Sequence, residues 1–234
     1  MITIDHIQKK FGKFTALEDI SVQFQQGQTV ALIGPNGSGK TTLLKCMLEM
    51  VIPDQGQILF NEVNIKNDSQ YRRKIGYMPQ IGKFPDNMSI AQVFDMMKDI
   101  RRDEKNTDDE LVEAFGLNQI MDKRMRTLSG GTRQKVGASL AFMFNPDVLI
   151  LDEPTAGLDP LSSEILKAKI LKERDKGKLI LITSHVLSEL DEMITDVLFL
   201  QEGRLEFFKS LETLKEETGE YNLTRSIAGI MRRK

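Results

Sequence analysis

The chain has 234 residues, of which 40% are hydrophobic and 28% are charged, and its formal net charge is −2. This length can bury one substantial core, and the composition excludes a disordered chain. Basic residues occur in short scattered clusters instead of on one face, so the sequence predicts no binding to nucleic acid. The single cysteine, Cys46, excludes an internal disulfide bond.

The sequence contains no candidate membrane segment. No apolar run approaches the ~20 residues that a membrane-spanning helix needs. The opening segment, MITIDHIQKK, lacks the apolar stretch of a signal peptide. We therefore expect a chain that is soluble by itself, with no membrane span of its own. If it works at a membrane, a separate chain must provide the spanning part.

The first elements predicted along the chain are β-strands. Residues 2–7 and 17–24 have the alternation and spacing of antiparallel strands. Residues 29–33, TVALI, form a continuous apolar run that favours a central strand covered on both faces. Residues 56–65 predict a short hairpin or edge strand. Because such strands alternate with helical patterns, we expect an α/β fold with a largely parallel sheet.

A glycine-rich segment, GPNGSGKTT, follows the strand at 29–33 and precedes a helical pattern. It fits the spacing Gly-x-x-x-x-Gly-Lys-Ser/Thr of a phosphate-binding loop. Its glycines let backbone N–H groups point at phosphate oxygens, and the next helix adds its positive dipole end. In this motif Lys40 reaches the β- and γ-phosphates and the Thr41 hydroxyl binds Mg²⁺. The predicted nucleotide-binding residues of this loop are Gly34, Pro35, Asn36, Gly37, Ser38, Gly39, Lys40, Thr41 and Thr42.

Residues 83–145 interrupt the strands with helical patterns and predict a helical lobe inserted into the α/β core. Ser89 with Gln92, and Thr107 with Glu110, match the capping box that starts a helix. Near the end of this region, the segment LSGGTRQK places a serine and two glycines at a helix start. Backbone N–H groups at such a start can meet an anion. The chain therefore has a second segment suited to an anion.

A further apolar strand, predicted at 147–151, ends in two carboxylates, Asp152 and Glu153. Ligands of α/β proteins gather at the carboxyl ends of strands. Side chains alternate along a strand, so the two carboxylates should point in different directions. Asp152 is the better partner for Mg²⁺, and Glu153 is the candidate general base or water-positioning group. A strand at 178–183, a strand pair in VLFLQEGRLEFF and a short polar helix complete the chain.

These motifs together resemble the ATP-binding subunit of an ABC transporter over nearly the whole chain. LSGGT stands where that family has Leu-Ser-Gly-Gly-Gln, between the phosphate loop and the carboxylate strand. The resemblance implies an α/β P-loop NTPase of ABC type, with a mostly parallel core sheet, an antiparallel β subdomain and an inserted helical lobe. It implies one ABC ATPase domain over residues 1–234. The nucleotide-binding core is expected at 1–82 and 146–208, the helical lobe at 83–145 and a helical tail at 209–234.

The resemblance also assigns roles to three residues outside those motifs. Gln80 in GYMPQ matches the family's Q-loop glutamine, which can join Mg²⁺-bound water and take part in catalysis. Asp159 in AGLD belongs to the segment that matches the D-loop. His185 in TSHVLSELDE matches the switch histidine, which can contact the γ-phosphate.

Phe11 matches the aromatic residue that stacks on adenine, where the family more usually has tyrosine. Stacking needs only the ring face, so the missing hydroxyl is tolerable. In the family, the residues matching Ser129, Gly130 and Gly131 contact ATP held by a second subunit. Thr132 replaces the usual glutamine, which affects the fine positioning of this helix and leaves phosphate binding intact.

The resemblance implies Mg²⁺-dependent ATP hydrolysis coupled to transport. Because the family pairs two subunits head to tail around ATP, we expect a homodimer. We also expect an integral membrane permease chain that contacts the helical lobe and Gln80. The subunit would then be cytoplasmic and peripheral on the inner face of the cell membrane. EPTAGLDP and the absence of a long regulatory C-terminal domain are similar to bacterial exporter ATPases.

Narrower and rival interpretations remain open. GYMPQIGKFPDNMSI and SHVLSELDEM are similar to the ATPase of a copper-processing system for nitrous oxide reductase maturation, although nothing in the nucleotide machinery reads out the cargo. A soluble ABC ATPase acting on ribosomes or DNA is the main alternative. Single-domain length and the lack of sustained heptads weigh against it. Intact Glu153 and His185 weigh against a nucleotide-gated module that does not hydrolyse ATP.

Overall fold

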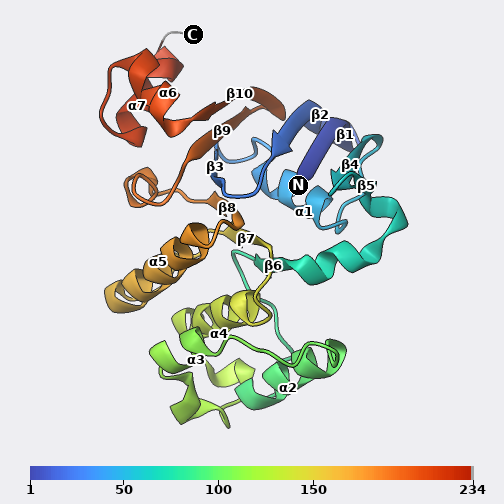
Figure 1. The fold of residues 1–234 in the computed structure, drawn as a ribbon, viewed down its shortest axis with the longest axis vertical. Helices are drawn as coiled ribbons and strands as arrows, with labels where there is room; N and C mark the ends of the chain where they lie inside the picture. The colour runs from blue at the N-terminus through green and yellow to red at the C-terminus, as the bar shows by residue number, and fades with distance from the viewer. Residues whose placement is uncertain (233–234) are drawn as a thin grey trace. The chain divides into compact units, whose positions relative to one another are not determined.

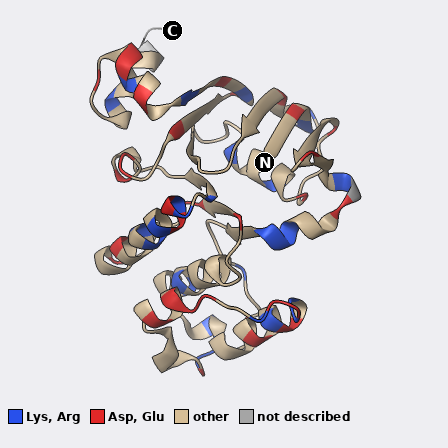
Figure 2. Cartoon of the chain, in the orientation of Figure 1, with Lys and Arg blue, Asp and Glu red and all other residues tan. Residues whose placement is uncertain are grey.

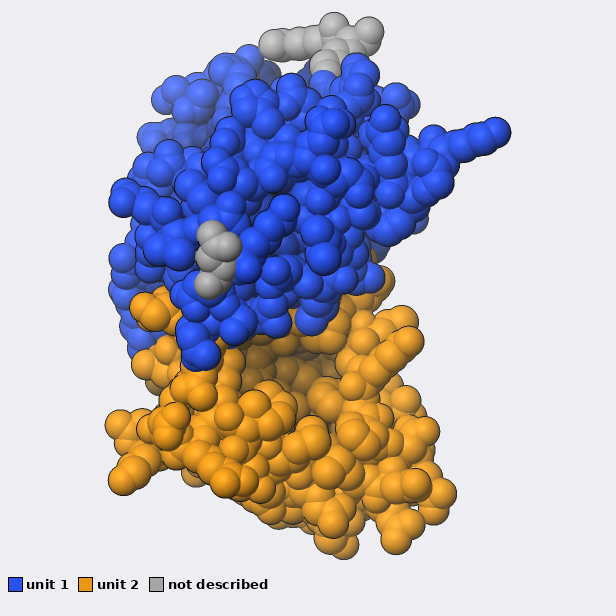
Figure 3. Space-filling model, turned by 90° about the vertical axis from the view of Figure 1, so that its right-hand side faces the viewer, with its two compact units in different colours: residues 1–72, 174–234 blue, residues 73–173 orange. Residues whose placement is uncertain are grey.

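The computed structural model describes residues 1–232, so the last two residues of the basic tail lie outside the described part. The chain divides into two compact units (Figure 3). Unit 1 contains Met1–Arg72 and Arg174–Lys234, and unit 2 contains Arg73–Glu173. Unit 2 thus holds the predicted helical lobe together with strands and a helix from the segments on either side of it.

Unit 1 contains an antiparallel sheet in the strand order β2-β1-β4-β5 (Figure 1). Its strands are β1 (Ile2–Phe11), β2 (Phe14–Phe24), β4 (Gln55–Phe60) and β5 (Val63–Asn64). The alternation in the sequence therefore predicted these strands and their antiparallel pairing.

A second set of strands in unit 1 has the order β10-β9-β3-β8. β3 (Thr29–Ile33) runs parallel to β8 (Leu179–Thr183) and to β9 (Asp196–Gln201), and β10 (Arg204–Ser210) is antiparallel to β9. Every residue of β3 and β8 is buried, as their continuous apolar runs predict.

The rest of unit 1 is helical. α1 (Lys40–Met47) follows β3, and α6 (Leu211–Thr218) and α7 (Leu223–Arg232) follow β10. The tail therefore forms two helices where the sequence pattern predicted one. α6 ends because Gly219 takes the left-handed conformation, with φ at 69°.

Unit 2 pairs β6 (Ile75–Met78) in parallel with β7 (Val148–Asp152). Its helices are α2 (Ile90–Ile100), α3 (Glu110–Ala114), α4 (Gly130–Phe142) and α5 (Pro160–Asp175), whose last two residues belong to unit 1. The short 3-10 helices of the whole chain are η1 (Ile65–Asn67), η2 (Ser69–Lys74), η3 (Leu117–Ile120), η4 (Met125–Thr127) and η5 (Leu187–Glu189).

The helical part of unit 2 has a hydrophobic core of its own. Buried apolar side chains from α2, α3, α4 and the turns between them form it: Ile90, Val93, Phe94, Val112, Leu117, Met125, Leu128, Val136 and Met143. Acidic and basic residues are interspersed along the ribbons of both units (Figure 2). Within residues 1–232, none of the helices combines the length and apolar character that crossing a bilayer requires.

One of the two predicted capping boxes is confirmed and the other is wrong. At α2, the Ser89 hydroxyl accepts a hydrogen bond from the Gln92 N–H, and the Gln92 side chain accepts one from the Ser89 N–H. At α3 the helix begins at Glu110, and the Asp108 carboxylate accepts its N–H at 3.0 Å. The Glu110 carboxylate is turned to Lys169 instead of to a cap, because that buried ammonium needs anionic partners.

Candidate nucleotide site

The phosphate loop of unit 1 is held by backbone contacts that admit only glycine at Gly39. This residue has φ at 103°, and a Cβ atom there would lie 2.6 Å from the backbone oxygen of Ala16. From the turn between β9 and β10, the Gly203 N–H donates to the Ser38 carbonyl oxygen at 3.1 Å. The loop is therefore fixed by two neighbouring segments of unit 1 as well as by its own sequence.

Lys40 is the first residue of α1, and its side chain folds over the loop. Its ammonium donates to the carbonyl oxygens of Gly34 at 2.7 Å and Pro35 at 3.0 Å. Gly39 at the N-cap brings no side chain that could accept from the first N–H groups of α1. This combination of an ammonium and a helix start suits a polyphosphate.

Phe11, the candidate adenine-stacking residue, ends β1 and is 50% exposed. The Lys9 ammonium lies 5.5 Å from the centroid of its ring and also binds Asp54 at 2.8 Å. The ring of Phe11 is therefore accessible at the tip of the β1–β2 hairpin, and an accessible ring face is what stacking on a base requires.

His185 and the phosphate loop follow neighbouring strands. Leu32 of β3 pairs with Thr183 of β8 in a parallel ladder, and the chain continues from these strands to Gly34 and to His185. The two segments therefore leave the sheet of unit 1 at the same edge, the carboxyl ends of its parallel strands, where α/β proteins bind ligands. His185 is exposed.

Unit 2 repeats this arrangement with Gln80 and Asp152. Met78 of β6 pairs in parallel with Leu151 of β7; Asp152 directly follows Leu151, and Gln80 comes two residues after Met78. Asp152 is 4% exposed, whereas Gln80 is exposed. Strand β6 was absent from the sequence prediction because its four residues, Ile75–Met78, include a glycine and are too short for a clear pattern.

Glu153 lies just outside the strand, so strand alternation does not set the direction of its side chain relative to Asp152. β7 ends at Asp152, and Glu153 has a left-handed backbone with φ at 51°. Such a conformation is uncommon outside glycine and is found at functional sites. Its carbonyl oxygen accepts from the Ala156 N–H at 3.1 Å and from the Gln134 side chain at 3.4 Å.

The LSGG segment starts α4, with Ser129 at the N-cap. The Ser129 hydroxyl accepts from the Thr132 N–H at 3.2 Å and lies 2.8 Å from the Thr132 hydroxyl. A Cβ atom on Gly131 would lie 2.8 Å from the Gly157 carbonyl oxygen, so this position must be small. Ser129 and Gly130 are exposed. Thr132 thus takes part in the cap at the position where the family has glutamine.

Asp159 is tied to the same helix. The Lys135 ammonium contacts its carboxylate at 2.9 Å, and Ser162 donates to it from its N–H and its hydroxyl. These contacts hold the pKa of Asp159 below its usual range, with the Ser162 N–H as the largest cause and Lys135 next. Gln134 and Lys135 lie within LSGGTRQK, but their partners, Glu153 and Asp159, follow β7, so no local pattern predicts these contacts.

The comparisons with known proteins decide the family. Residues 17–156 match the family model described as ABC transporter. The ABC transporter ATP-binding protein YtrB of Bacillus subtilis (strain 168) is 31% identical over 219 residues, which are 93% of this chain and 74% of that protein. The chain belongs to the ABC transporter family. It is an ATP-binding subunit with the ATPase activity of this family.

Solved structures show the same fold. An ATP-binding subunit of an ABC transporter superposes with a TM-score of 0.88 at 24% identity, covering 99% of each chain. The ATP-binding cassette MJ0796, solved as a dimer in a post-hydrolysis state with ADP and Pi, superposes with a TM-score of 0.78 at 20% identity. That match covers 90% of this chain and 99% of the cassette. The predicted fold class, an α/β P-loop NTPase of ABC type, is confirmed.

The donor atoms predicted for Mg²⁺ in this ABC ATPase fit the ion by type. Thr41, Gln80 and Asp152 offer a hydroxyl, an amide oxygen and a carboxylate, and Mg²⁺ takes oxygen donors together with substrate phosphates and water. Among residues 1–232, no group of three or more His, Cys, Asp or Glu side chains forms a separate metal site.

Proposed function

We propose that two copies of this ABC ATPase pair head to tail and that each ATP lies between the phosphate loop of one copy and the LSGG segment of the other. The start of α4 carries this proposal. Ser129 and Gly130 are exposed at the first turn of a helix of 13 residues, where N–H groups favour an anion. Unit 1 already has its own phosphate loop, so a second anion-facing helix start is explained by a partner's nucleotide.

The roles of the other residues follow from this arrangement. Lys40 binds the β- and γ-phosphates, Thr41 and Asp152 bind Mg²⁺, and Phe11 stacks on the adenine. Glu153 takes a proton from the attacking water or orients it. When bound, Mg²⁺ would supply positive charge to the phosphates. Gln80 would help to hold it, and His185 would contact the γ-phosphate.

Ser129→Asp tests the dimer directly. Aspartate caps a helix as well as serine does, so α4 should stay folded, but its charge would repel the partner's γ-phosphate. We expect monomers to bind ATP with unchanged affinity while ATP-driven dimerisation, measured by sedimentation, is lost. Ser129→Asn keeps the cap without the charge and should dimerise more readily than the aspartate variant.

Lys40→Ala is the complementary control, because it should weaken the binding of ATP to the monomer. A calorimetric titration measures this affinity. If Ser129→Asp dimerises at the same ATP concentration as the wild-type protein, the LSGG segment is not part of the nucleotide interface. Unchanged ATP affinity in Lys40→Ala would instead refute the role of the phosphate loop.

A groove in unit 2 supports the proposed permease contact. It has a volume of about 280 Å³ and is lined by residues of β6, the segment after it, α2 and α4. Apolar side chains such as Met97, Leu140 and Phe144 line it, and the Arg101 guanidinium lies 4.6 Å from the centroid of the Phe144 ring. Such a groove fits a short amphipathic helix of the permease, which would be held next to Gln80.

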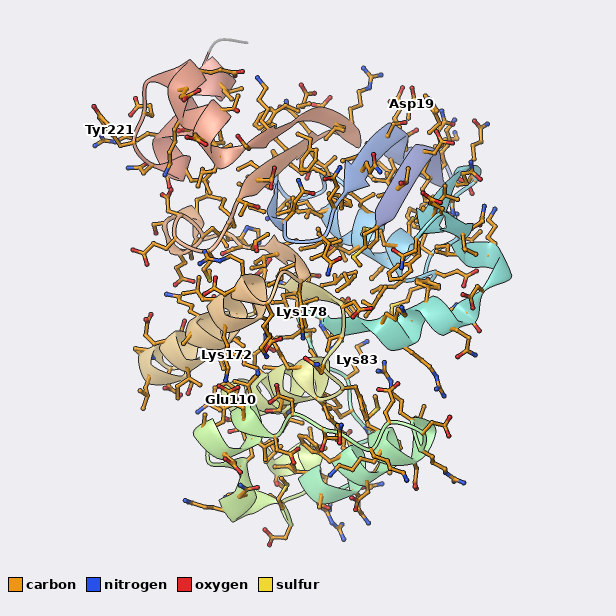
Figure 4. The ribbon with its side chains drawn as sticks, viewed as in Figure 1. Asp19, Lys83, Glu110, Lys172, Lys178 and Tyr221 are labelled. Carbon is orange, nitrogen blue, oxygen red and sulfur yellow. The ribbon has the colours of Figure 1, made fainter. Side chains whose placement is uncertain are left out.

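Ile81 directly follows Gln80 in the sequence, and Lys83, labelled in Figure 4, is one of the residues that line the groove. Ile81 is 74% exposed, which suits an apolar contact with a partner chain. We expect Ile81→Glu to release the subunit from washed membranes of its own cells while the ATPase activity of the purified subunit is retained. Ile81→Leu is the matched control. Membrane retention of Ile81→Glu equal to that of the control would argue against this docking site.

We further propose that the subunit sits at the inner face of the cell membrane through this permease. The copper-processing hypothesis rests on two sequence segments alone and stays a prediction, as does exporter-like transport. The domain boundaries and the roles of single site residues likewise stay proposals until variants are measured.

A further inference from the structure

The segment from Ser184 to Thr195, here called the switch loop, has exposed residues around His185 and buried apolar residues in its second half. His185 is exposed and Val186 is 51% exposed. Further along, Leu190, Met193 and Ile194 are 1%, 3% and 6% exposed. The part of the loop that carries the histidine is therefore attached to a part that is packed into unit 1.

Asp191 joins this packed part to the C-terminal helices. Both of its carboxylate oxygens accept the N–H of Leu223, the first residue of α7, at 3.0 and 3.2 Å. One of them also contacts the Lys215 ammonium of α6 at 3.0 Å. The Asp191 side chain is only 19% exposed, so these contacts are shielded from water and salt.

The two helices that hold Asp191 are themselves joined. The Thr218 hydroxyl of α6 lies 3.2 Å from the Ser226 hydroxyl of α7. Leu214 of α6 and Leu223 and Ile227 of α7 are buried, with Leu214 and Leu223 fully inaccessible. α6 and α7 therefore act on Asp191 as one body.

Two further contacts fix the end of the switch loop. The Leu211 N–H at the start of α6 donates to the Thr195 carbonyl oxygen at 2.8 Å. The Arg174 guanidinium donates to the Glu192 carbonyl oxygen at 2.9 Å. Both contacts lie on the C-terminal side of Asp191, so together with the contacts of Asp191 they fix the second half of the switch loop. A change at α6 or α7 therefore acts on the same loop that carries His185.

We propose that Asp191 is a positioning residue for ATP hydrolysis: through it, the C-terminal helix pair α6–α7 sets the position of the switch loop and of His185. This inference rests on the proposed role of His185 at the γ-phosphate. The C-terminal helices then contribute to catalysis, and a partner or a modification that moves α6–α7 can change the rate of ATP hydrolysis. Nucleotide binding, which uses the phosphate loop, is not affected by it.

The test is the kinetics of Asp191→Ala in the full chain. We expect kcat for ATP to fall about ten-fold, since small misplacements of a catalytic group can cost up to ~100-fold, while KM and ATP affinity stay unchanged. Hydrogen exchange of the amides at 184–190 should accelerate. Asp191→Glu should restore much of the rate, and Glu192→Ala, which removes a neighbouring exposed side chain and leaves its backbone contact to Arg174, should behave as wild type.

Asp191→Asn replaces the alanine variant in this test if the alanine variant does not fold. Its amide oxygen still accepts the Leu223 N–H, but the attraction to Lys215 is lost. We expect a smaller decrease in kcat than in Asp191→Ala. Wild-type kcat with unaltered exchange at 184–190 would overturn the proposal. His185→Ala, measured in parallel, separates the two hypotheses. Loss of turnover in His185→Ala with normal turnover in Asp191→Ala refutes only the positioning role, whereas normal turnover in His185→Ala refutes the role of the histidine and the positioning proposal with it.

Discussion

Glu153→Gln is expected to bind ATP normally and to lose nearly all ATP turnover. Glutamine has the size of glutamate but cannot take a proton from water at neutral pH. Removing a general base typically costs 10²–10⁴-fold in rate, and we expect a decrease of about this size in kcat. Because ATP would persist between the subunits, the variant should also accumulate as a dimer in the presence of ATP.

The backbone at Glu153 makes a matched control necessary. Its left-handed conformation, with φ at 51°, could itself respond to substitution. Glu62 has φ at 69° on the exposed turn between β4 and β5, so Glu62→Gln makes the same chemical change on a similar backbone away from the proposed site. Glu62→Gln should keep wild-type phosphate release and wild-type dimerisation.

Phosphate release measured under saturating ATP, together with sedimentation with and without ATP, decides the assignment. Turnover by Glu153→Gln at the rate of Glu62→Gln would show that Glu153 is not the base. Loss of ATP binding would show a structural role instead. A decrease in kcat with unchanged ATP affinity is the result that the proposed mechanism requires.

The features that the sequence predicts correctly are those that depend on interactions between residues close together in the chain. TVALI predicts β3 because a continuous apolar run of this length suits a strand that is covered on both faces. The phosphate loop that follows it is specified within nine residues, because its glycines and Lys40 act on each other directly. The confirmed Ser89–Gln92 capping box is local in the same sense.

The parts that were missed depend on residues far apart in the chain. The Thr107–Glu110 capping box failed because Lys169 binds the Glu110 carboxylate, a contact that no local pattern contains. Glu153 leaves its strand because the turn after β7 and Gln134 bind its carbonyl oxygen. The hydrogen bonds from the Leu223 N–H of α7 to Asp191 likewise join residues far apart in the chain. Local patterns therefore yielded the candidate site residues but not the long-range contacts that position them.

Lys169→Met is expected to destabilise unit 2 by ~3–5 kcal/mol, the usual cost of removing one partner from a buried ion pair. The Lys169 side chain is 2% exposed, and its ammonium contacts Asp108 at 2.5 Å, Glu110 at 2.8 Å and Glu173 at 3.0 Å. Burial alone would lower the pKa of Lys169, but the hydrogen bonds to these carboxylates outweigh it and raise the pKa above its usual range. Methionine would fill the space and leave the carboxylates without this cation.

Lys172→Met is the matched control, because it removes a second ammonium from the same Glu110 oxygen. Lys172 contacts that oxygen at 2.8 Å, but its side chain is 54% exposed. Figure 4 shows Lys172 of α5 beside Glu110 of α3. Exposed ion pairs contribute about 0–1 kcal/mol, so this variant should unfold nearly as wild type. Equal unfolding midpoints for the two variants in urea would show that burial at Lys169 does not determine the cost.

The pH dependence of unfolding gives a second test of the same cluster. Lys169 and then Lys172 lower the pKa of Glu110 below its ordinary value of 4.5. A carboxylate with a lowered pKa in the folded state stabilises the fold above pH 4.5, and this contribution is lost as the pH falls through the folded-state pKa. Wild-type unit 2 should therefore lose stability below that pH, and Lys169→Met should lose less, because the main cause of the shift is gone. Hydrogen exchange at α3 across this pH range measures the difference, and parallel curves for the two proteins would show that Glu110 is not coupled to Lys169.

The cluster joins α5, which follows Asp159, to α3 of the helical lobe, so its strength sets how firmly the lobe is attached within unit 2.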